Sequence, residues 1–478
     1  MDMLAGGAEH AGDVVILGAG LAGLAAGSLL SDSGADVVIV ERERTVGGLA
    51  RTIEHHGFRF DLGGHRFFTG NKRIEDFVGE AVGGDLLPVR RSSKILLDGA
   101  YFDYPLKPLG ALGALGLRTA AAALFDYSAE QIRWRFRNGG IESFEDLVVR
   151  RFGRTLFDIF IKEYSEKVWG TECDRIAKEL AEWRIQGLSF RVAIQDALFR
   201  RGGRDARTLA REFLYPPLGI GCVAEGLRRK IETSNVVLTG AEVTRVYHSA
   251  GKIDCVLAGR GDRAWLHRAR DFVSSIPITT LLRILDPKPP AAVLDAAARL
   301  RFRDLVIVTV MIDRPRVTDQ SWIYVPRREI PFGRIHEPTN WSERMAPEGK
   351  TLLVTEHFCF RGDRIWGASD DSLVKSTVAS LESLGFVRGR EVLGGLVLRI
   401  PGAYPIFEIG HDDALRTIRG YLERFGNLRV TGRGGTFSYF NMDHAIESGI
   451  DAAEGIAVGD RAHYRRGRAD LVAAEARP

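Results

Sequence analysis

A glycine-rich turn between an apolar strand and a helix constrains the fold of this chain most strongly. The apolar run at 14–17 leads into Gly18, Gly20 and Gly23, and the next apolar run ends at an acid, Glu41. In this pattern the first glycine permits the tight turn, the second lets a pyrophosphate approach the backbone, and the third lets the helix pack close to the strand. The sequence therefore predicts a βαβ dinucleotide-binding unit, with Glu41 placed to accept a hydrogen bond from an adenosine ribose.

The segment after the ribose-binding acid bears on which dinucleotide binds. Gly47 and Gly48, followed by Leu49, form a second glycine pair that nicotinamide binding does not require. This pair resembles the extended FAD signature of the amine oxidase superfamily, which implies FAD as the cofactor. Arg42 and Arg44 leave NADP open as an alternative, because arginines near the ribose acid can bind a 2′-phosphate. That alternative would leave the glycine pair unexplained.

Length and composition bound the architecture and the partners. A chain of 478 residues exceeds one comfortable hydrophobic core, so we expect two domains. The net charge of +4 is small for this length and gives no reason to predict nucleic-acid binding. The four cysteines are widely separated and suggest neither a zinc site nor a disulfide framework. No metal is predicted either, because His336, His357 and His444 lack metal-ligand spacing.

No export signal is visible in the sequence, and we expect a cytoplasmic, reduced protein. Residues 1–12 lack a basic segment followed by a long apolar core. The most apolar later window, 109–125, contains Arg118 and several glycines and is too short to span a bilayer. A buried helix is the simpler interpretation of that window, and a helix in peripheral contact with a membrane is the alternative.

The order of the expected elements predicts a cofactor domain assembled from separated segments. Helical spacing dominates from about 72 to 215, and short strands then alternate between 236 and 257, with Val243 assigned to the cofactor site. Near the end, Gly432 and Arg433 lie in a second strand, glycine loop and helix pattern that suits an anionic or carbonyl edge of a cofactor. The expected fold class is α/β: a Rossmann-like FAD-binding domain of the GR2 type, with an inserted substrate domain of mixed helices and sheet.

The predicted domains are discontinuous along the chain. The FAD-binding domain combines three segments: 1–80, 216–285 and 405–465. The substrate-binding region combines residues 81–215 and 286–404. A basic tail, residues 466–478, follows the last cofactor segment.

Five short motifs follow one another along the rest of the chain. They contain Gly64 with His65, Trp169, Arg334, Tyr404, and the stretch from Gly432 to Met442. In this order they resemble motifs of the amine oxidase and protoporphyrinogen oxidase-like FAD superfamily, and within it the UDP-galactopyranose mutases.

That resemblance implies a role for each motif. The loop of Gly64 and His65 would pass beside the isoalloxazine, and Arg433 and Met442 would belong to the C-terminal flavin loop and helix. The catalytic candidates are the residues that would contact the substrate or the flavin near it: Arg334, Tyr404, Trp169 and His65.

Two departures from the mutase pattern weaken the case for a sugar diphosphate substrate. Phe437 stands where the pattern has a tyrosine hydroxyl, and Phe68 stands where it has a second histidine. Loss of a hydrogen bond to a charged group costs roughly 1.5–3 kcal/mol. Neither change bears on the flavin assignment.

The leading functional hypothesis is an FAD-dependent oxidoreductase that takes a hydride from a sugar-derived or other polar small molecule. The alternative, implied by the mutase resemblance, is a redox-neutral pyranose/furanose mutase of a nucleotide sugar that uses reduced flavin. In that case Arg334 and Arg184 would neutralise the leaving phosphate. The expected partner is a small molecule, with a nucleotide sugar or a glycosyl intermediate as candidates. A flavin-binding scaffold without activity is the third hypothesis.

Overall fold

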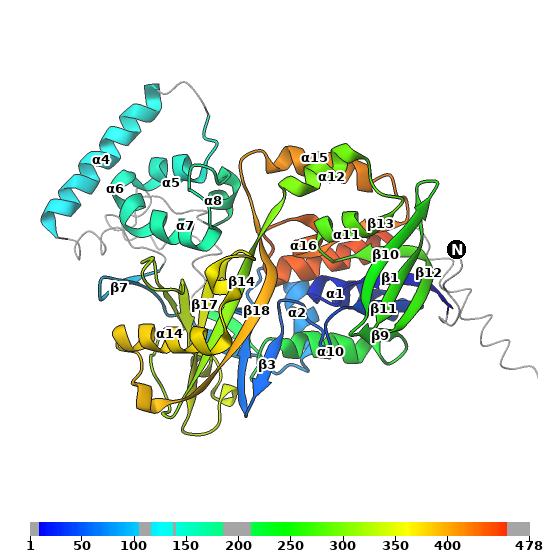
Figure 1. The fold of residues 1–478 in the computed structure, drawn as a ribbon, viewed down its shortest axis with the longest axis horizontal. Coiled ribbons are helices and arrows are strands. Elements are labelled where there is room, and N and C mark those ends of the chain that lie inside the picture. The colour runs from blue at the N-terminus through cyan, green and yellow to red at the C-terminus, as the bar shows by residue number, and fades with distance from the viewer. Residues whose placement is uncertain (1–8, 105–115, 137–139, 185–211, 457–478) are drawn as a thin grey trace, which may run out of the picture.

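The computed structural model describes residues 9–104, 116–136, 140–184 and 212–456. Two large sheets organise these residues, one of eight strands and one of seven (Figure 1). Two further sheets have two strands each: β3 (Thr52–His55) with β4 (Phe58–Asp61), and β5 (Leu87–Arg90) with β8 (Glu212–Tyr215).

The eight-stranded sheet contains the βαβ unit that the glycine pattern predicts. Its central strands are β1 (Glu9–Leu17), β2 (Val37–Glu41) and β12 (Arg263–Ser274), and β1 pairs in parallel with the other two. The helix α1 (Leu21–Asp32) connects β1 to β2. Residues 37–41 of β2 are all buried, which explains a run of apolar residues without alternation. The other strands are β9 (Val236–Thr239), β10 (Glu242–Ser249), β11 (Lys252–Arg260), β13 (Leu285–Asp286) and β19 (Leu428–Val430).

The seven-stranded sheet combines strands from both halves of the chain. Its order is β18-β14-β17-β16-β15-β6-β7, and β14 pairs antiparallel with both of its neighbours. The strands are β6 (Ser93–Leu97), β7 (Ala100–Asp103), β14 (Arg301–Ile312), β15 (Trp322–Tyr324), β16 (Arg334–His336), β17 (Thr351–Cys359) and β18 (Val392–Ile406). Arg334 on β16 therefore lies directly opposite Glu356 on β17.

Helices cover the sheets and form a separate group beside the seven-stranded sheet (Figure 1). That group contains α4 (Leu117–Phe136), α5 (Phe144–Phe152), α6 (Arg154–Leu156), a π-helical turn (Phe157–Lys162), α7 (Glu163–Trp169) and α8 (Lys178–Arg184). The others are α2 (Lys72–Ala81), α10 (Gly221–Ile231), α11 (Ile278–Ile284), α12 (Ala291–Arg299), α13 (Arg364–Gly367), α14 (Asp370–Ser383), α15 (His411–Leu422) and α16 (Gly432–Thr436). Residues 442–456 form the last described helix.

The expectation of mainly helical structure from 72 to 215 is wrong for part of that stretch, which contains β5, β6, β7 and β8. β6 pairs with β15, which lies more than two hundred residues further along, so local spacing does not reveal it. A local signal was present in the Asp98-Gly99 turn between β6 and β7, where both residues have positive φ. Such pairs favour tight hairpins.

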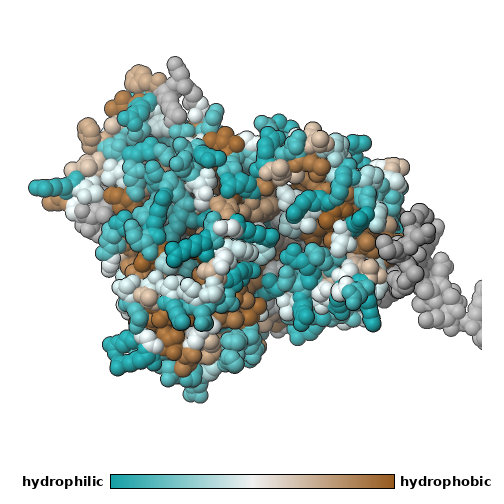
Figure 2. All heavy atoms as spheres, viewed as in Figure 1, coloured by the Kyte–Doolittle hydropathy of each residue, from teal (hydrophilic) through white to brown (hydrophobic). Residues whose placement is uncertain are grey.

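The apolar window at 109–125 is only partly described, because 109–115 lie outside the described residues. Its remaining part begins α4, where Leu117 is 91% exposed and Phe125 is 78% exposed, so this part is not a buried helix. Figure 2 shows apolar and hydrophilic side chains side by side along α4. Among the described helices, none is long and apolar enough to cross a membrane. Peripheral membrane contact stays a prediction.

The fold class predicted from the sequence is confirmed. The parallel βαβ sheet is assembled from residues near the start, the middle and the end of the chain, since β19 pairs with β12 and β12 pairs with β1. The exact domain boundaries stay predictions.

Candidate functional site

The glycine turn after β1 leaves bare backbone at the N-terminus of α1. Gly18 has a φ of 97°, a conformation that favours glycine, and Gly20 precedes α1 without any side-chain cap. A Cβ on Gly23 would lie 2.0 Å from the Gly18 carbonyl oxygen, so only glycine lets the helix approach the strand this closely. A Cβ on Gly20 would meet nothing within 4 Å. The uncapped N–H groups beside this open space suit a pyrophosphate.

Glu41 fixes this turn from the end of β2. Its buried carboxylate accepts hydrogen bonds from the backbone N–H groups of Ala19 at 2.7 Å and Glu43 at 2.8 Å. A carboxylate accepts about four hydrogen bonds, which leaves capacity for a ribose hydroxyl. Gly47 donates its N–H to the Ala19 carbonyl at 2.7 Å and forms a bridge with Gly20. The second glycine pair therefore lies against the first turn, as the sequence predicts.

The remaining predicted cofactor residues lie around the same turn. Gly48 would bring a Cβ to 3.2 Å from the Gly20 Cα, and Leu49 packs partly buried against the core. Val243 is the second residue of β10 and lies two residues after Ala241, whose N–H donates to the Glu41 carbonyl. Gly48 therefore lies against the turn at Gly20, and the cofactor roles of Leu49 and Val243 stay predictions.

The C-terminal loop and helix pack onto α1. Gly432 has a φ of 76°, and a Cβ there would lie 3.0 Å from the Ala22 Cβ. Met442, which is buried, begins the helix of 442–456. Arg433 donates from Nε to the Phe440 carbonyl at 2.7 Å. The C-terminal segment therefore packs against α1 beside the glycine turn. The residues of the turn and of this segment fit the predicted FAD.

A second glycine loop follows β4 and packs directly against an indole ring. A Cβ on Gly64 would lie only 1.2 Å from the ring of Trp322, so no side chain can replace this hydrogen without moving the indole. The Gly64 N–H donates to Glu356 Oε1 at 3.3 Å. Next in the chain, His65 has Nδ1 3.2 Å from the Gly63 carbonyl. Burial and the nearby Arg433 lower the pKa of His65 to about 4, so its ring is neutral at pH 7.

Arg334 and Glu356 form a buried ion pair beside this loop. Arg334 Nη1 lies 3.0 Å from Glu356 Oε2, and the Glu356 side chain has no exposed surface. Arg334 also donates to the Tyr164 hydroxyl at 2.8 Å and to the Tyr404 hydroxyl at 3.4 Å. The predicted substrate-binding arginine is therefore balanced by a carboxylate, and that carboxylate holds the loop through Gly64.

Trp169 closes the other side of this group. It is 2% exposed and makes edge contacts with the rings of Tyr404 and Tyr439, each at 6.2 Å between centroids. The structure thus brings Trp169 and Arg334 to the same tyrosine, Tyr404. His65 joins them through the loop that Glu356 holds.

Two of the three residues discussed from the mutase pattern do not belong to this cluster, and the third is not placed. The ring of Phe437 is 1% exposed and packs against Phe302 at 5.0 Å and Phe407 at 5.6 Å between centroids. It therefore serves the core. Phe68 is 42% exposed, so its ring lies outside the buried group of Arg334, Tyr404 and Trp169. Arg184 ends α8, and its side chain lies outside the described residues.

Glu356 and Trp322 belong to the site but were not predicted from the sequence. Trp322 begins the short strand β15, and Glu356 is the one carboxylate of β17, whose residues are all buried. A carboxylate in such a strand requires a paired cation, because burying a lone charge is costly. That pattern was the available signal. Trp322 carried no signal, since a lone tryptophan is usually core.

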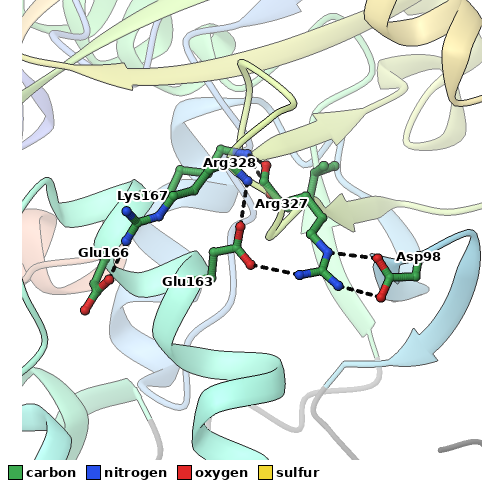
Figure 3. A network of polar contacts seen from close by, with 7 residues as sticks. Asp98, Glu163, Glu166, Lys167, Arg327 and Arg328 are labelled. Atoms are coloured by element: carbon green, nitrogen blue, oxygen red, sulfur yellow. Dashed lines mark hydrogen bonds and ion pairs between the residues drawn. The ribbon is translucent and has the colours of Figure 1, made fainter.

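Polar contacts fix α7, which carries Tyr164 and Trp169, to the turn between β15 and β16 (Figure 3). Arg327 makes two hydrogen bonds with Asp98, at 2.8 and 2.5 Å, and one with Glu163 at 3.3 Å. Arg328 pairs with Glu166. Lys167 donates to the carbonyls of residues 325, 327 and 332 at 2.7–2.9 Å. Two site residues are thereby held in place from outside the cluster.

Replacing Lys167 with methionine is expected to lower the free energy of unfolding by about 2–4 kcal/mol. The carbonyls of residues 325 and 332 lose this donor, whereas that of residue 327 keeps the Ile330 N–H at 3.3 Å. Each buried acceptor left unsatisfied costs about 1–3 kcal/mol. Urea unfolding measures the loss. Lys375→Met is the matched control, because its side chain is 81% exposed and its contact with Asp371 is long, at 3.9 Å. Equal losses in both variants would contradict the anchoring role.

Asp61 precedes the second glycine loop and predicts a pH effect on stability. Its carboxylate accepts from Tyr215 and Thr52 hydroxyls, each at 2.6 Å, and from the Ile220 N–H at 3.1 Å. Burial raises its pKa from 3.8 to about 6. Between these values the folded state holds a proton on Asp61 that the unfolded state has lost, so the contribution of Asp61 to the free energy of unfolding falls as pH rises from about 4 to about 6.

Asp61→Asn is expected to remove this contribution. Urea unfolding at pH 4.5 and pH 6.5 compares the two proteins. The free energy of unfolding at pH 6.5 minus that at pH 4.5 is expected to be more positive in the variant, because the fall contributed by Asp61 is gone. An unchanged difference would show that Asp61 titrates alike in both states.

Comparison with known proteins agrees with these features. A family model described as flavin containing amine oxidoreductase matches residues 21–457. The chloroplastic protoporphyrinogen oxidase of Nicotiana tabacum is 21% identical over 495 residues, which cover 92% of this chain and 84% of that protein.

Solved structures share the fold. A crystal structure of reduced UDP-galactopyranose mutase superposes with a TM-score of 0.81 at 21% identity, covering 95% of this chain and 98% of that chain. Cyclohexylamine oxidase from Brevibacterium oxydans IH-35A superposes with a TM-score of 0.64 at 16% identity, covering 94% and 99%. At these identities the superpositions establish the fold alone.

Proposed function

The chain belongs to the family of flavin-containing amine oxidoreductases, and we propose that it removes a hydride from a C–H bond of a sugar-derived or other polar small molecule. Family membership makes it a flavoenzyme with FAD as its cofactor. Bound FAD supplies the hydride acceptor, and the protein supplies binding, orientation and exclusion of water.

The cofactor would lie along the bare backbone described above. Glu41 would accept from the ribose, and the uncapped first turn of α1 would donate to the pyrophosphate. The other residues that we assign to the cofactor are Gly18, Gly20, Gly23, Gly47, Gly48, Leu49, Gly64, Val243, Gly432, Arg433 and Met442.

The buried Arg334–Glu356 pair is the observation that carries the proposal for the substrate. Among the described residues, the three hydrogen bonds of Arg334 use Nε and Nη1, so its Nη2 donors would serve a substrate oxygen. The Tyr404 hydroxyl would orient the same polar group, and Trp169 would exclude water. Because the pKa of His65 is about 4, we assign it a hydrogen-bonding role and not that of a general base.

Anaerobic flavin absorbance tests this proposal. Purified holoprotein is mixed with a panel of nucleotide sugars, sugar acids, neutral sugars and primary amines, and loss of the oxidised flavin band is followed. At least one polar compound is expected to bleach the flavin, and Tyr404→Phe is expected to slow bleaching by about tenfold or more, through loss of one hydrogen bond. Tyr101→Phe is the control, since Tyr101 is 52% exposed. Bleaching by dithionite but by no compound of the panel would contradict the proposal.

A second candidate function is the redox-neutral mutase. The superposition on reduced UDP-galactopyranose mutase, with its TM-score of 0.81, supports it, although only as a likeness of fold. The core position of Phe437 supports it further, because a residue packed between Phe302 and Phe407 is not a lost substrate contact. In this reading Arg334 would hold a phosphate of the nucleotide sugar.

A further inference from the structure

A second arginine, Arg66, lies next to the site and is not neutralised as Arg334 is. It follows His65 in the glycine loop after β4 and is half-buried. Its Cζ lies 5.5 Å from the centroid of Trp322, the ring that packs against Gly64. Within the described residues the structure gives the Arg66 guanidinium this ring as its contact and no carboxylate. Its positive charge is therefore available to a ligand.

Arg91 brings another guanidinium to the same region. It is half-buried, donates from Nε to the Ser93 hydroxyl at 3.2 Å, and has its Cζ 5.5 Å from the centroid of Tyr104. Burial, and then repulsion from Arg66, lower the pKa of Arg91. The two cations are thus close enough to disfavour each other's charge.

Aromatic rings connect the two arginines into one wall. The ring centroids of Tyr104 and Tyr324 are 4.4 Å apart, and those of Tyr324 and Trp322 are 6.2 Å apart. The Trp322 indole N–H is buried and has no hydrogen-bond partner in the described part of the chain. Burial also raises the pKa of Tyr324, so its phenol stays neutral at pH 7. This wall therefore adds donors and rings but no negative charge.

Arg66 and Arg91 bring two positive charges to this wall, whereas the charge of Arg334 lies 3.0 Å from Glu356. Two half-buried guanidinium groups repel each other, and an anion between them offsets that repulsion. Guanidinium groups match the oxygens of carboxylates and phosphates with paired donors.

We propose that Arg66 and Arg91 form a subsite for an anionic group of the substrate, a carboxylate or a phosphate. This subsite would lie beside Trp322, next to the glycine loop after β4. The proposal rests on the proposed function and narrows its substrate to an acid or a phosphate ester. It also separates this chain from relatives whose names specify amines, because an ammonium group would be repelled here.

Titration of the holoprotein with two probes tests the subsite. Inorganic pyrophosphate and succinate are added separately, and the shift of the flavin absorption band gives a Kd for each. The probe that binds more tightly distinguishes a phosphate from a carboxylate. We expect Arg66→Gln and Arg91→Gln each to raise that Kd by about tenfold or more, and Arg66→Lys to raise it less, because lysine keeps the charge but loses the paired donors.

Arg135→Gln, on the exposed surface of α4, is the control and is expected to leave the Kd unchanged. Flavin content and the midpoint of thermal unfolding confirm that each variant is folded. Failure of both anions to bind the wild-type holoprotein, or equal binding by Arg66→Gln and wild type, would overturn the subsite. Anion binding without any substrate that bleaches the flavin would leave the subsite standing and contradict the oxidoreductase.

Discussion

Replacing Glu356 with leucine is expected to lower the free energy of unfolding by about 3–5 kcal/mol, the cost of leaving a buried charge without its partner. Glu356 has no exposed side-chain surface, and Arg334 is 9% exposed, so water cannot substitute for the lost carboxylate. The Gly64 N–H loses its acceptor in the same variant. Urea unfolding measures the stability, and the flavin absorption band reports the loop.

Glu356→Gln separates charge from shape. The amide oxygen can still accept from Gly64, so the loop and the flavin band are expected to change little, while the loss of charge still destabilises Arg334. Glu54→Gln is the control, since the Glu54 side chain is 58% exposed. Wild-type stability in Glu356→Leu would show that Arg334 does not depend on this carboxylate.

Alanine at Gly64 is the second substitution with a large expected effect. The added Cβ would lie 1.2 Å from the Trp322 ring, which cannot yield easily because it is 4% exposed and stacks with His336 at 5.3 Å between centroids. Overpacking of this kind costs about 1–3 kcal/mol and sometimes more, and a contact this short belongs at the upper end. Flavin content and urea unfolding are the measurements.

A second substitution shows whether the indole is the cause. Gly64→Ala combined with Trp322→Ala is expected to be more stable than the sum of the two single losses, because the cavity admits the methyl group. Gly70→Ala is the control in the same loop, since a Cβ there meets nothing within 4 Å. Simple additivity of the two losses would contradict the assigned contact.

The nucleotide half of the site could be predicted from the sequence because its geometry is local. The sequence pattern gives a different backbone reason for glycine at each of Gly18, Gly20 and Gly23. All three lie between the end of β1 and the first turn of α1. The structure shows those reasons directly, as a φ of 97° at Gly18 and a 2.0 Å clash at Gly23. Glu41 belongs to the same unit, since only α1 and β2 lie between it and the turn.

The substrate half could not be predicted in the same way because its contacts join distant strands. Arg334 was recognised from a motif, but its partner Glu356 became visible only once β16 and β17 were paired. Arg66 and Trp322 likewise meet across more than two hundred residues. Phe437 was judged from its place in a motif, and its left-handed φ of 51° and core position could not be read from the sequence.

Turnover of UDP-galactopyranose under anaerobic conditions tests the central claim most directly. Furanose product is measured with the flavin oxidised and again after reduction by dithionite. We expect no furanose in either state, because an oxidoreductase of this kind does not interconvert the two ring forms. Furanose formed only with reduced flavin would contradict that assignment and establish the mutase.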